Sequence, residues 1–296
     1  MSPMQNAISP ALSDLRRSLA EAALRSGPAA AGKVSLGAAE IDAALSGGLE
    51  RAALHEVYAA GTADLAAATG FALGLALRAA QGEAGDDAAR PILWVRQDFV
   101  DAETGRLHAP GLNELGLDPG RLLLVRARDA LGVLRAGAEG ARCPALGAVL
   151  IEPWGEPRAF DLTASRRLAL AAEDSGVATL LLRVAAAEAP SAARTRWQVV
   201  PLASRALEAN APGAPAFALR LLRHRGGVRG DAAEREWRVE WNRDRCAFEN
   251  RTVFDRSDRL IPRRNDVPPL SRPLVSLSGD GQAAAAGPDS GLRRAG

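Results

Sequence analysis

Short apolar segments alternate along most of this chain with longer segments in which apolar residues recur at helical spacing. Five apolar runs have the length and the lack of polar alternation typical of strands in a parallel sheet covered on both faces. They occupy residues 54–58, 91–95, 122–125, 146–152 and 177–184. Residues 65–80, 129–140 and 160–174 lie between these runs and predict helices. The pattern therefore predicts an α/β fold with a doubly wound, mainly parallel sheet.

The pattern changes at both ends of this region. Residues 10–25 carry leucines at helical spacing between charged residues, which predicts an amphipathic helix that packs on this core or on a partner. After residue 185, three segments alternate polar and apolar residues with period two and predict antiparallel strands at the C-terminal end of the sheet. They are residues 194–200, 217–225 and 235–243. Beyond about residue 250 the chain is rich in Pro, Arg, Ser, Gly and Ala, which is typical of disorder.

Three parts follow from these changes. We expect an N-terminal helix and linker over residues 1–32, a core domain over 33–248 and a largely disordered tail over 249–296. Hydrophobic residues make up 47% of the chain and aromatic residues only 4%, so Leu, Val and Ala must provide most of the packing. No apolar run approaches the roughly 20 residues that span a bilayer, and the first residues lack a secretory pattern. The sequence therefore predicts a cytoplasmic protein without a membrane span.

Charge and metal-binding residues limit the possible chemistry. The net charge of +2 is too small to demand a polyanionic partner, and Lys33 is the only lysine. The two cysteines form no CxxC pair, and the three histidines show no metal-binding spacing, so we expect no metal site. Because no serine lies in a GxSxG motif, the sequence also provides no candidate catalytic nucleophile.

The turn after the first predicted strand is the most informative segment. In an α/β nucleotide-binding fold this turn cradles phosphate, and a working P-loop needs glycines, a lysine and a hydroxyl for magnesium. Here Gly61 and Thr62 remain, but apolar residues beginning at Leu65 replace the lysine and its hydroxyl, and Asp64 adds negative charge. We therefore expect a degenerate loop, no catalytic residues, and neither ATP nor Mg²⁺ as a cofactor.

Carboxylates follow two of the predicted strands. Glu152 ends the run 146–152, where a Walker B carboxylate would coordinate magnesium, but a carboxylate at a strand end without a ligand explains it equally well. Asp98, Asp101 and Glu103 follow the run 91–95, and we expect them to lie in a solvated loop.

Arginine and tryptophan cluster in the C-terminal third of the chain. This mixture can follow a phosphate backbone and stack on bases, although acidic neighbours make a mixed-charge solvated face an equal alternative. The candidate contacts to DNA or a partner are Arg194, Arg196, Trp197, Arg220, Arg223, Arg225, Arg229, Trp241, Arg243 and Arg245.

Several of these segments, in this order, resemble one family. SLGAAEIDAALSGGLERAALHEVYAAG is similar to the start of the RecA core, and ILWVRQDFVDAETGRLHAPGLNELGLDPGRLLLVRARD is similar to the RecA segment that follows. LGAVLIEPWG, and RTRWQVV followed by LRLLRHRGG, resemble the ImuA family of damage-inducible mutagenesis proteins. The resemblance covers residues 33–245 and implies a RecA-like core whose mainly parallel sheet ends in antiparallel strands.

The resemblance also implies a function and partners. It implies a non-catalytic accessory of the mutasome in SOS-induced translesion synthesis and DNA repair, associated with the nucleoid. The implied partners are ImuB, an error-prone DnaE-type polymerase and RecA, with single-stranded DNA as a further candidate. In RecA the stretch matching 194–197 follows a DNA-binding loop, and the pair matching Arg223 and Arg225 lies near the nucleotide across a subunit interface.

Two other functions remain open at this point. A DNA-stimulated, RecA-like ATPase would use an arginine in place of the missing lysine, since arginine can bind phosphate through two hydrogen bonds. A cell-division inhibitor of the SulA type is the other alternative, because that family is also related to this framework.

Overall fold

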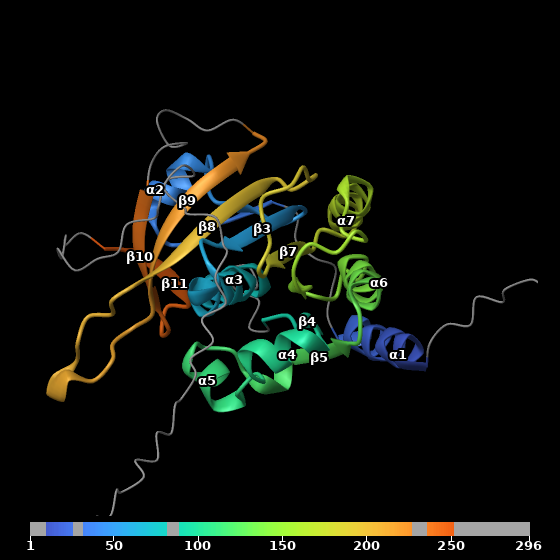
Figure 1. Cartoon of the computed structure of the whole chain (residues 1–296), viewed down its shortest axis with the longest axis horizontal. Helices are drawn as coiled ribbons and strands as arrows, with labels where there is room; N and C mark the ends of the chain where they lie inside the picture. Colours follow the sequence, from blue (N-terminus) through green and yellow to red (C-terminus); the bar gives the residue numbers. More distant parts are fainter. Residues whose placement is uncertain (1–9, 26–31, 82–88, 227–235, 252–296) are drawn as a thin grey trace, which may run out of the picture. The chain divides into compact units, whose positions relative to one another are not determined.

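A computed structural model of the chain describes residues 10–25, 32–81, 89–226 and 236–251 (Figure 1). The chain divides into two units, Met1–Ile261 and Pro262–Gly296, and all described residues belong to the first. Arg229 and nearly all of the predicted tail therefore lie outside the described residues.

Nine strands form the main sheet, in the order β11-β10-β9-β8-β3-β7-β6-β4-β5. The parallel part contains β3 (Leu54–Ala59), β4 (Ile92–Gln97), β5 (Leu122–Ala127), β6 (Ala148–Glu152), β7 (Ala178–Arg183) and β8 (Thr195–Leu202). The antiparallel part continues with β9 (Ala216–His224), β10 (Glu236–Asn242) and β11 (Ala247–Asn250). The α/β fold with a mainly parallel sheet is confirmed. One strand differs from the prediction, because β8 is parallel to β3 and only its other edge pairs antiparallel.

Helices cover both faces of the parallel part (Figure 1). On one face, α3 (Leu65–Ala80) packs across β3, β6, β7 and β8. On the other face, α6 (Ala130–Ala141) packs on β4, β5 and β6, and α7 (Leu162–Ser175) packs on β3 and β7. We call these the α3 face and the α7 face. Each has its own apolar core, as expected when short apolar strands are covered from both sides.

Smaller elements complete the described part of the chain. The pair β1 (Lys33–Val34) and β2 (Leu49–Glu50) forms a separate two-stranded sheet. Between them lies α2 (Ala39–Ala44), and after β4 come α4 (Asp98–Thr104) and α5 (Ala109–Glu114). The 3-10 turns are η1 (Thr62–Asp64), η2 (Pro119–Arg121) and η3 (Glu208–Asn210). None of these short elements shows a long apolar period, so the sequence pattern did not predict them.

Aspartates define where two of the predicted helices begin. The side chain of Asp129 accepts a hydrogen bond from the Gly132 amide at the start of α6, and Asp161 accepts one from the Ala164 amide at the start of α7, both at 2.7 Å. Such N-caps satisfy amides that have no partner within the helix. The local sequence therefore sets these boundaries close to the predicted ones.

The N-terminal helix packs on the same core as the rest of the described chain. In α1 (Pro10–Arg25), Leu15 and Leu19 are buried in the core of the α7 face. Arg16 pairs with Glu139 of α6 at 2.8 Å, a partly exposed contact. Of the two packing alternatives for this helix, the structure shows the contact with its own core.

The core of the α3 face depends on α3 and on the last described strand. Phe248 of β11 is fully buried, and its ring contacts Phe71 of α3 at 5.1 Å and Trp241 at 4.8 Å between centroids. Gly74 permits this approach, since an added Cβ would lie 2.5 Å from Phe248 Cζ. The predicted end of the core domain at residue 248 therefore falls inside β11, which continues to Asn250.

Among the residues that the structure describes, one helix is long and apolar enough to cross a membrane by length and composition. It is the segment Thr62–Ala80, whose most apolar window is 67% buried inside the structure. Because α3 is enclosed by the sheet, β11 and the segments around α2, its apolar sequence is that of a core helix.

His55 is a buried titratable residue near the start of β3. It is 0% exposed, with Nδ1 2.8 Å from Thr195 Oγ1 and Nε2 2.7 Å from the Glu50 carbonyl oxygen. Burial lowers the pKa of His55 to about 4, and the nearby His224 and Arg194 act in the same direction. In the unfolded chain the pKa is about 6.5, so the unfolded state binds this proton first as the pH falls.

The difference between the folded and unfolded pKa values of His55 predicts that acidification lowers the free energy of unfolding through this one residue. The His55 contribution to the free energy of unfolding is complete above about pH 6.5 and is lost as the pH falls toward 4, by at most about 3 kcal/mol. We expect urea unfolding at pH 4.5 and 7.5 to show a smaller difference for His55→Gln than for the unmodified chain. The exposed His108 provides the control, because His108→Gln should keep the full difference. Equal differences for the unmodified chain and His55→Gln would refute this assignment.

Candidate functional site

The loop between β3 and α3 places a carboxylate where a nucleotide-binding loop would hold phosphate. Gly61 precedes the turn η1, and the Asp64 amide donates to the Gly61 carbonyl oxygen at 3.0 Å. Asp64 is 2% exposed, and a Cβ added to Gly61 would lie 3.6 Å from its Oδ2. The carboxylate thus lies inside the turn, at the end of α3 where the helix dipole favours an anion. Thr62 is exposed, and Leu65 packs on the core of the α3 face.

Glu152 lies at the C-terminal end of β6, as predicted, but its carboxylate is bound by neighbouring side chains. It is 2% exposed, and its Oε2 accepts hydrogen bonds from Trp94 Nε1 at 2.8 Å and Arg96 Nε at 2.6 Å. Burial raises the pKa of Glu152, while the contacts with Arg96 and Trp94 act in the opposite direction. This arrangement fits the structural alternative for Glu152, a carboxylate used inside the fold.

Arg96 connects Glu152 to the helix that follows β4. Its guanidinium pairs with Asp101 at 2.6 Å, and Asp101 also pairs with Arg126 at 2.9 Å. Asp98, Asp101 and Glu103 were expected in a solvated loop, and this expectation is wrong because all three lie in α4. In α4, Asp101 pairs with Arg96, five residues earlier in β4, and with Arg126 of β5, and only the second pair is too distant in sequence for local pattern reading.

The candidate tryptophans belong to the core. Trp197 is 0% exposed and Trp241 is 3% exposed. Trp197 packs edge-on against Phe71, and the Trp241 indole donates to the Leu115 carbonyl oxygen at 2.9 Å. Neither ring exposes a face to a base or a partner. The prediction that Trp197 and Trp241 contact DNA or a partner is therefore wrong. Period-two alternation places residues 197 and 241 on the inner side of their strands, and burial then follows from the cover that α3 provides.

Arg196 is also internal. It is 7% exposed and pairs with the buried Glu56 of β3 at 2.9 Å, through an interaction between neighbouring parallel strands. Its guanidinium also donates to Ser191 Oγ at 3.0 Å and to the Ala189 carbonyl oxygen at 2.6 Å. With these partners Arg196 holds the segment before β8 in place. The prediction that Arg196 contacts DNA or a partner is therefore wrong.

Two candidate arginines lie together on the surface at the end of β9. Arg223 and Arg225 are exposed, and both donate to the Ser191 carbonyl oxygen, at 3.3 and 3.1 Å. Arg194 is partly exposed and pairs with Glu50 at 2.5 Å. Arg220 lies in the middle of β9 and is half-buried. The structure thus places Arg223 and Arg225 next to each other at the end of β9. Ser191, in the segment before β8, contacts both of them.

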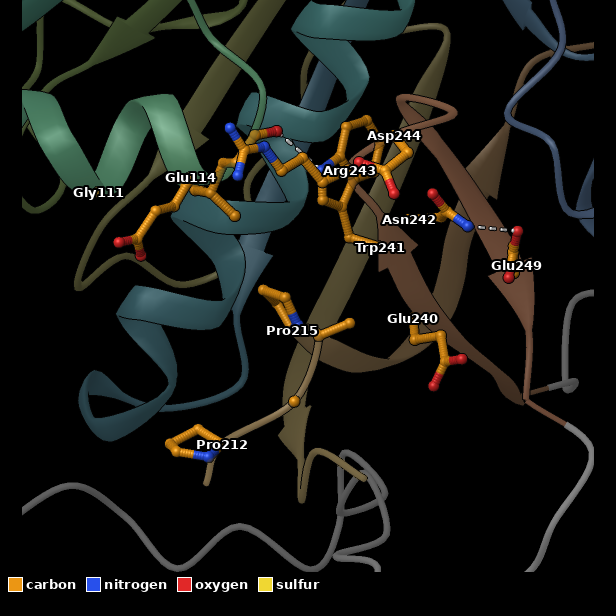
Figure 2. A pocket seen from close by; sticks show the side chains of 13 residues that line it. Gly111, Glu114, Pro212, Pro215, Glu240, Trp241, Asn242, Arg243, Asp244 and Glu249 are labelled. Atoms are coloured by element: carbon orange, nitrogen blue, oxygen red, sulfur yellow. Dashed lines mark hydrogen bonds between the residues drawn. The ribbon is translucent and has the colours of Figure 1, made fainter. Parts of the chain in front are cut away.

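Arg243 and Arg245 lie in the turn after β10, beside an open pocket of about 750 Å³ (Figure 2). The pocket lies between α5, residues 212–215 and β10. Among its lining residues, four are acidic and one is basic: Glu114, Glu240, Asp244, Glu249 and Arg243. Two of the carboxylates have arginine partners, since Arg205 pairs with Glu240 and Arg245 with Glu249. This lining opposes a phosphate backbone, so the pocket is a poor place for the expected DNA contact.

Sequence reasoning missed two buried arginines near the carboxyl ends of apolar strands. Arg96 is the next-to-last residue of β4 and Arg183 is the last residue of β7, and both are buried. The sequence could have indicated these arginines, because each follows an apolar run, as in ILWVR and TLLLR. A charge in that position lies at the carboxyl edge of the sheet. Among the residues that the structure describes, no group of three His, Cys, Asp or Glu side chains could hold a metal ion.

Comparisons with known proteins add no relative to this description. No protein-family model matches the chain, and a search of curated proteins finds no match either.

Proposed function

We propose that this chain is a RecA-like accessory protein that does not hydrolyse ATP and that serves as an adaptor in the SOS-induced mutasome. The observation that carries the first part is the internal pairing of Glu152 with Arg96 and Trp94. A carboxylate that coordinates Mg²⁺ must face the metal, whereas this one is bound by donors inside the fold. The loop after β3 supports the same conclusion, because it lacks lysine and contains the buried Asp64.

The mutasome assignment rests on the ImuA-like segments of the sequence. ImuB, an error-prone DnaE-type polymerase and RecA are the proposed partners, and single-stranded DNA is a further candidate ligand. The exposed Arg223 and Arg225 are the basic residues best placed for such contacts, since both are exposed and lie side by side. Association with the nucleoid belongs to the same proposal.

ATP binding and hydrolysis test the first part of the proposal. We expect no Mg²⁺-dependent ATP hydrolysis by the purified full-length chain, with or without single-stranded DNA. Robust hydrolysis that disappears in Glu152→Gln would support the ATPase alternative instead.

Retention of ImuB tests the adaptor part. We expect the full-length chain to retain ImuB in a pull-down, and Arg223→Glu together with Arg225→Glu to reduce retention at least about tenfold, since each reversal replaces attraction by repulsion. Arg166→Glu on α7 is the matched control, because Arg166 is exposed and lies outside this pair. Failure of the unmodified chain to retain ImuB would contradict the adaptor proposal. A deletion from residue 241 onward would be uninformative, because it removes Trp241 and Phe248 from the core.

A further inference from the structure

Arg183 is a buried arginine without a counter-charge. It ends β7, points to the α7 face and is 5% exposed. Its guanidinium makes no hydrogen bond or ion pair with any described residue, and its Nε is fully buried without an acceptor. Other buried arginines of this chain are paired, Arg96 with Glu152 and Arg196 with Glu56. Arg183 therefore differs from every comparable arginine in the described part of the chain.

The neighbour of Arg183 is Tyr58, another buried residue with an unsatisfied polar group. The two residues are directly opposite in the β3–β7 register, and the guanidinium carbon of Arg183 lies 5.9 Å from the centre of the Tyr58 ring. Tyr58 is 3% exposed, and burial raises its pKa, while the Ala189 backbone is close enough to its hydroxyl to lower the pKa of Tyr58. No hydrogen bond of normal geometry, however, forms between the hydroxyl and any described residue. Arg196 lies against the same ring at 5.5 Å.

The charges around Tyr58 do not balance. Arg196 is compensated by Glu56 at 2.9 Å, with the rim residue Glu188 at 3.7 Å. Arg183 has only the π face of Tyr58, which is a weak substitute for an anion. A buried ion without a counter-ion is strongly destabilising, and so is a buried hydroxyl without a partner. Both deficits would be removed together by one ligand that brings negative charge and hydrogen-bond acceptors.

The place of these residues in the sheet is one where ligands bind. β3 is followed by α3 on one face, whereas the segment after β7 passes along the other face, where the Ala192 amide donates to Ser165 Oγ of α7 at 3.0 Å. Neighbouring parallel strands whose connections leave on opposite faces create a crevice at their carboxyl ends, where open α/β sheets bind ligands. Tyr58 and Arg183 lie at the carboxyl ends of β3 and β7.

We propose that Arg183 and Tyr58 bind the phosphate group of a ligand at this edge of the sheet. The guanidinium can donate two parallel hydrogen bonds to phosphate oxygens and the phenol a third. Glu56 compensates the nearby Arg196, so Arg183 is the charge that attracts the anion, and three donors suit the oxygens of a phosphate monoester better than the two oxygens of a carboxylate. The site lies on the α7 face and so differs from the degenerate loop, which leads into α3 on the opposite face. The inference is independent of the mutasome proposal, because it requires no partner and no hydrolysis.

Thermal unfolding of the full-length chain in inorganic phosphate tests the site. Because a ligand that binds only the folded state raises its stability, the unfolding midpoint should rise with phosphate concentration and not with chloride at equal ionic strength. Arg183→Met should abolish this rise, and in chloride it should unfold at a higher temperature than the unmodified chain, since it removes an uncompensated buried charge. Arg166→Met on α7 is the matched control and should respond to phosphate like the unmodified chain.

Tyr58→Phe provides a second test that keeps the ring and the packing. It should fold like the unmodified chain and weaken phosphate binding about tenfold, the effect of one lost hydrogen bond. No rise in the unmodified chain, an equal rise in Arg183→Met, or an unchanged affinity in Tyr58→Phe would each overturn the proposal.

Competition experiments separate two sources of the phosphate group. Displacement of phosphate by adenosine monophosphate, dependent on Arg183, would identify a small phosphate monoester and support the proposal as stated. Displacement only by an oligonucleotide without terminal phosphates would identify a nucleic-acid backbone and overturn the preference for a monoester.

Discussion

Replacing Glu152 by leucine is expected to lower the free energy of unfolding by about 3–5 kcal/mol, because the substitution leaves Arg96 buried without one of its two carboxylates. The Trp94 indole N–H loses its acceptor at the same time. Urea unfolding of the full-length chain measures this loss. A carboxylate retained for metal binding would behave in the opposite way, since removing a functional charge from a site commonly stabilises the fold. An unchanged or increased stability in Glu152→Leu would therefore contradict the structural role.

A double replacement separates the pair from its individual residues. Arg96→Met combined with Glu152→Leu should cost less than the sum of the two single replacements, because the double variant leaves neither charge of this pair uncompensated. Glu103→Gln is the control, because Glu103 is exposed in the neighbouring α4 and should change stability by no more than about 0.5 kcal/mol. Additive single effects would show that Arg96 and Glu152 are not coupled.

Replacing Phe248 by alanine is expected to cost about 3–5 kcal/mol, the usual loss for a fully buried phenylalanine. The ring lies among Phe71, Phe217 and Trp241, so its removal leaves a cavity lined by aromatic rings that cannot close around it. The rigid helix α3 limits relaxation on one side, since Gly74 already lies close to the ring.

Chemical denaturation of Phe248→Ala measures this loss, and Phe99→Ala provides the comparison. Phe99 is 47% exposed and contacts only the ring of Trp154 among the aromatic residues described, so its replacement should cost well below half as much. A small effect of Phe248→Ala would mean that the core does not depend on β11. A large effect would place residues 247–250 in the folding unit.

The periodic part of the fold could be predicted from the sequence because its signal is local. Unalternating apolar runs indicated five of the parallel strands, and apolar spacing indicated α3, α6 and α7 close to their observed bounds. Short elements such as α4 escaped because seven residues are too few to show an apolar period, and the contact of Asp101 with Arg126 joins distant parts of the chain. β8 was predicted to be antiparallel, whereas it is parallel to β3, since period-two alternation shows which side of a strand is buried and not the direction of the strand beside it.

The candidate site depended more strongly on distant contacts. The arginine-rich segments looked uniform in sequence, yet the structure divides them into the buried Arg196, the exposed pair Arg223 and Arg225, and a turn beside an acidic pocket. The interaction of Arg196 with Glu56 joins residues 140 positions apart, and no local pattern reports such a pair. Tyr58 and Arg183 were overlooked because each looks like an ordinary strand residue until the register of β3 and β7 places them together.

The sequence by itself determined the α/β class, the helix starts at Asp129 and Asp161, and the absence of a lysine from the loop after β3. These features depend on side-chain period, capping and residue identity, all of which act within a few positions. Only the tertiary structure decided which charges are compensated, because a buried ion is stabilised by partners that the fold brings from other strands. In the tertiary structure Glu152 pairs with Arg96, whereas Arg183 has no anionic partner among the described residues.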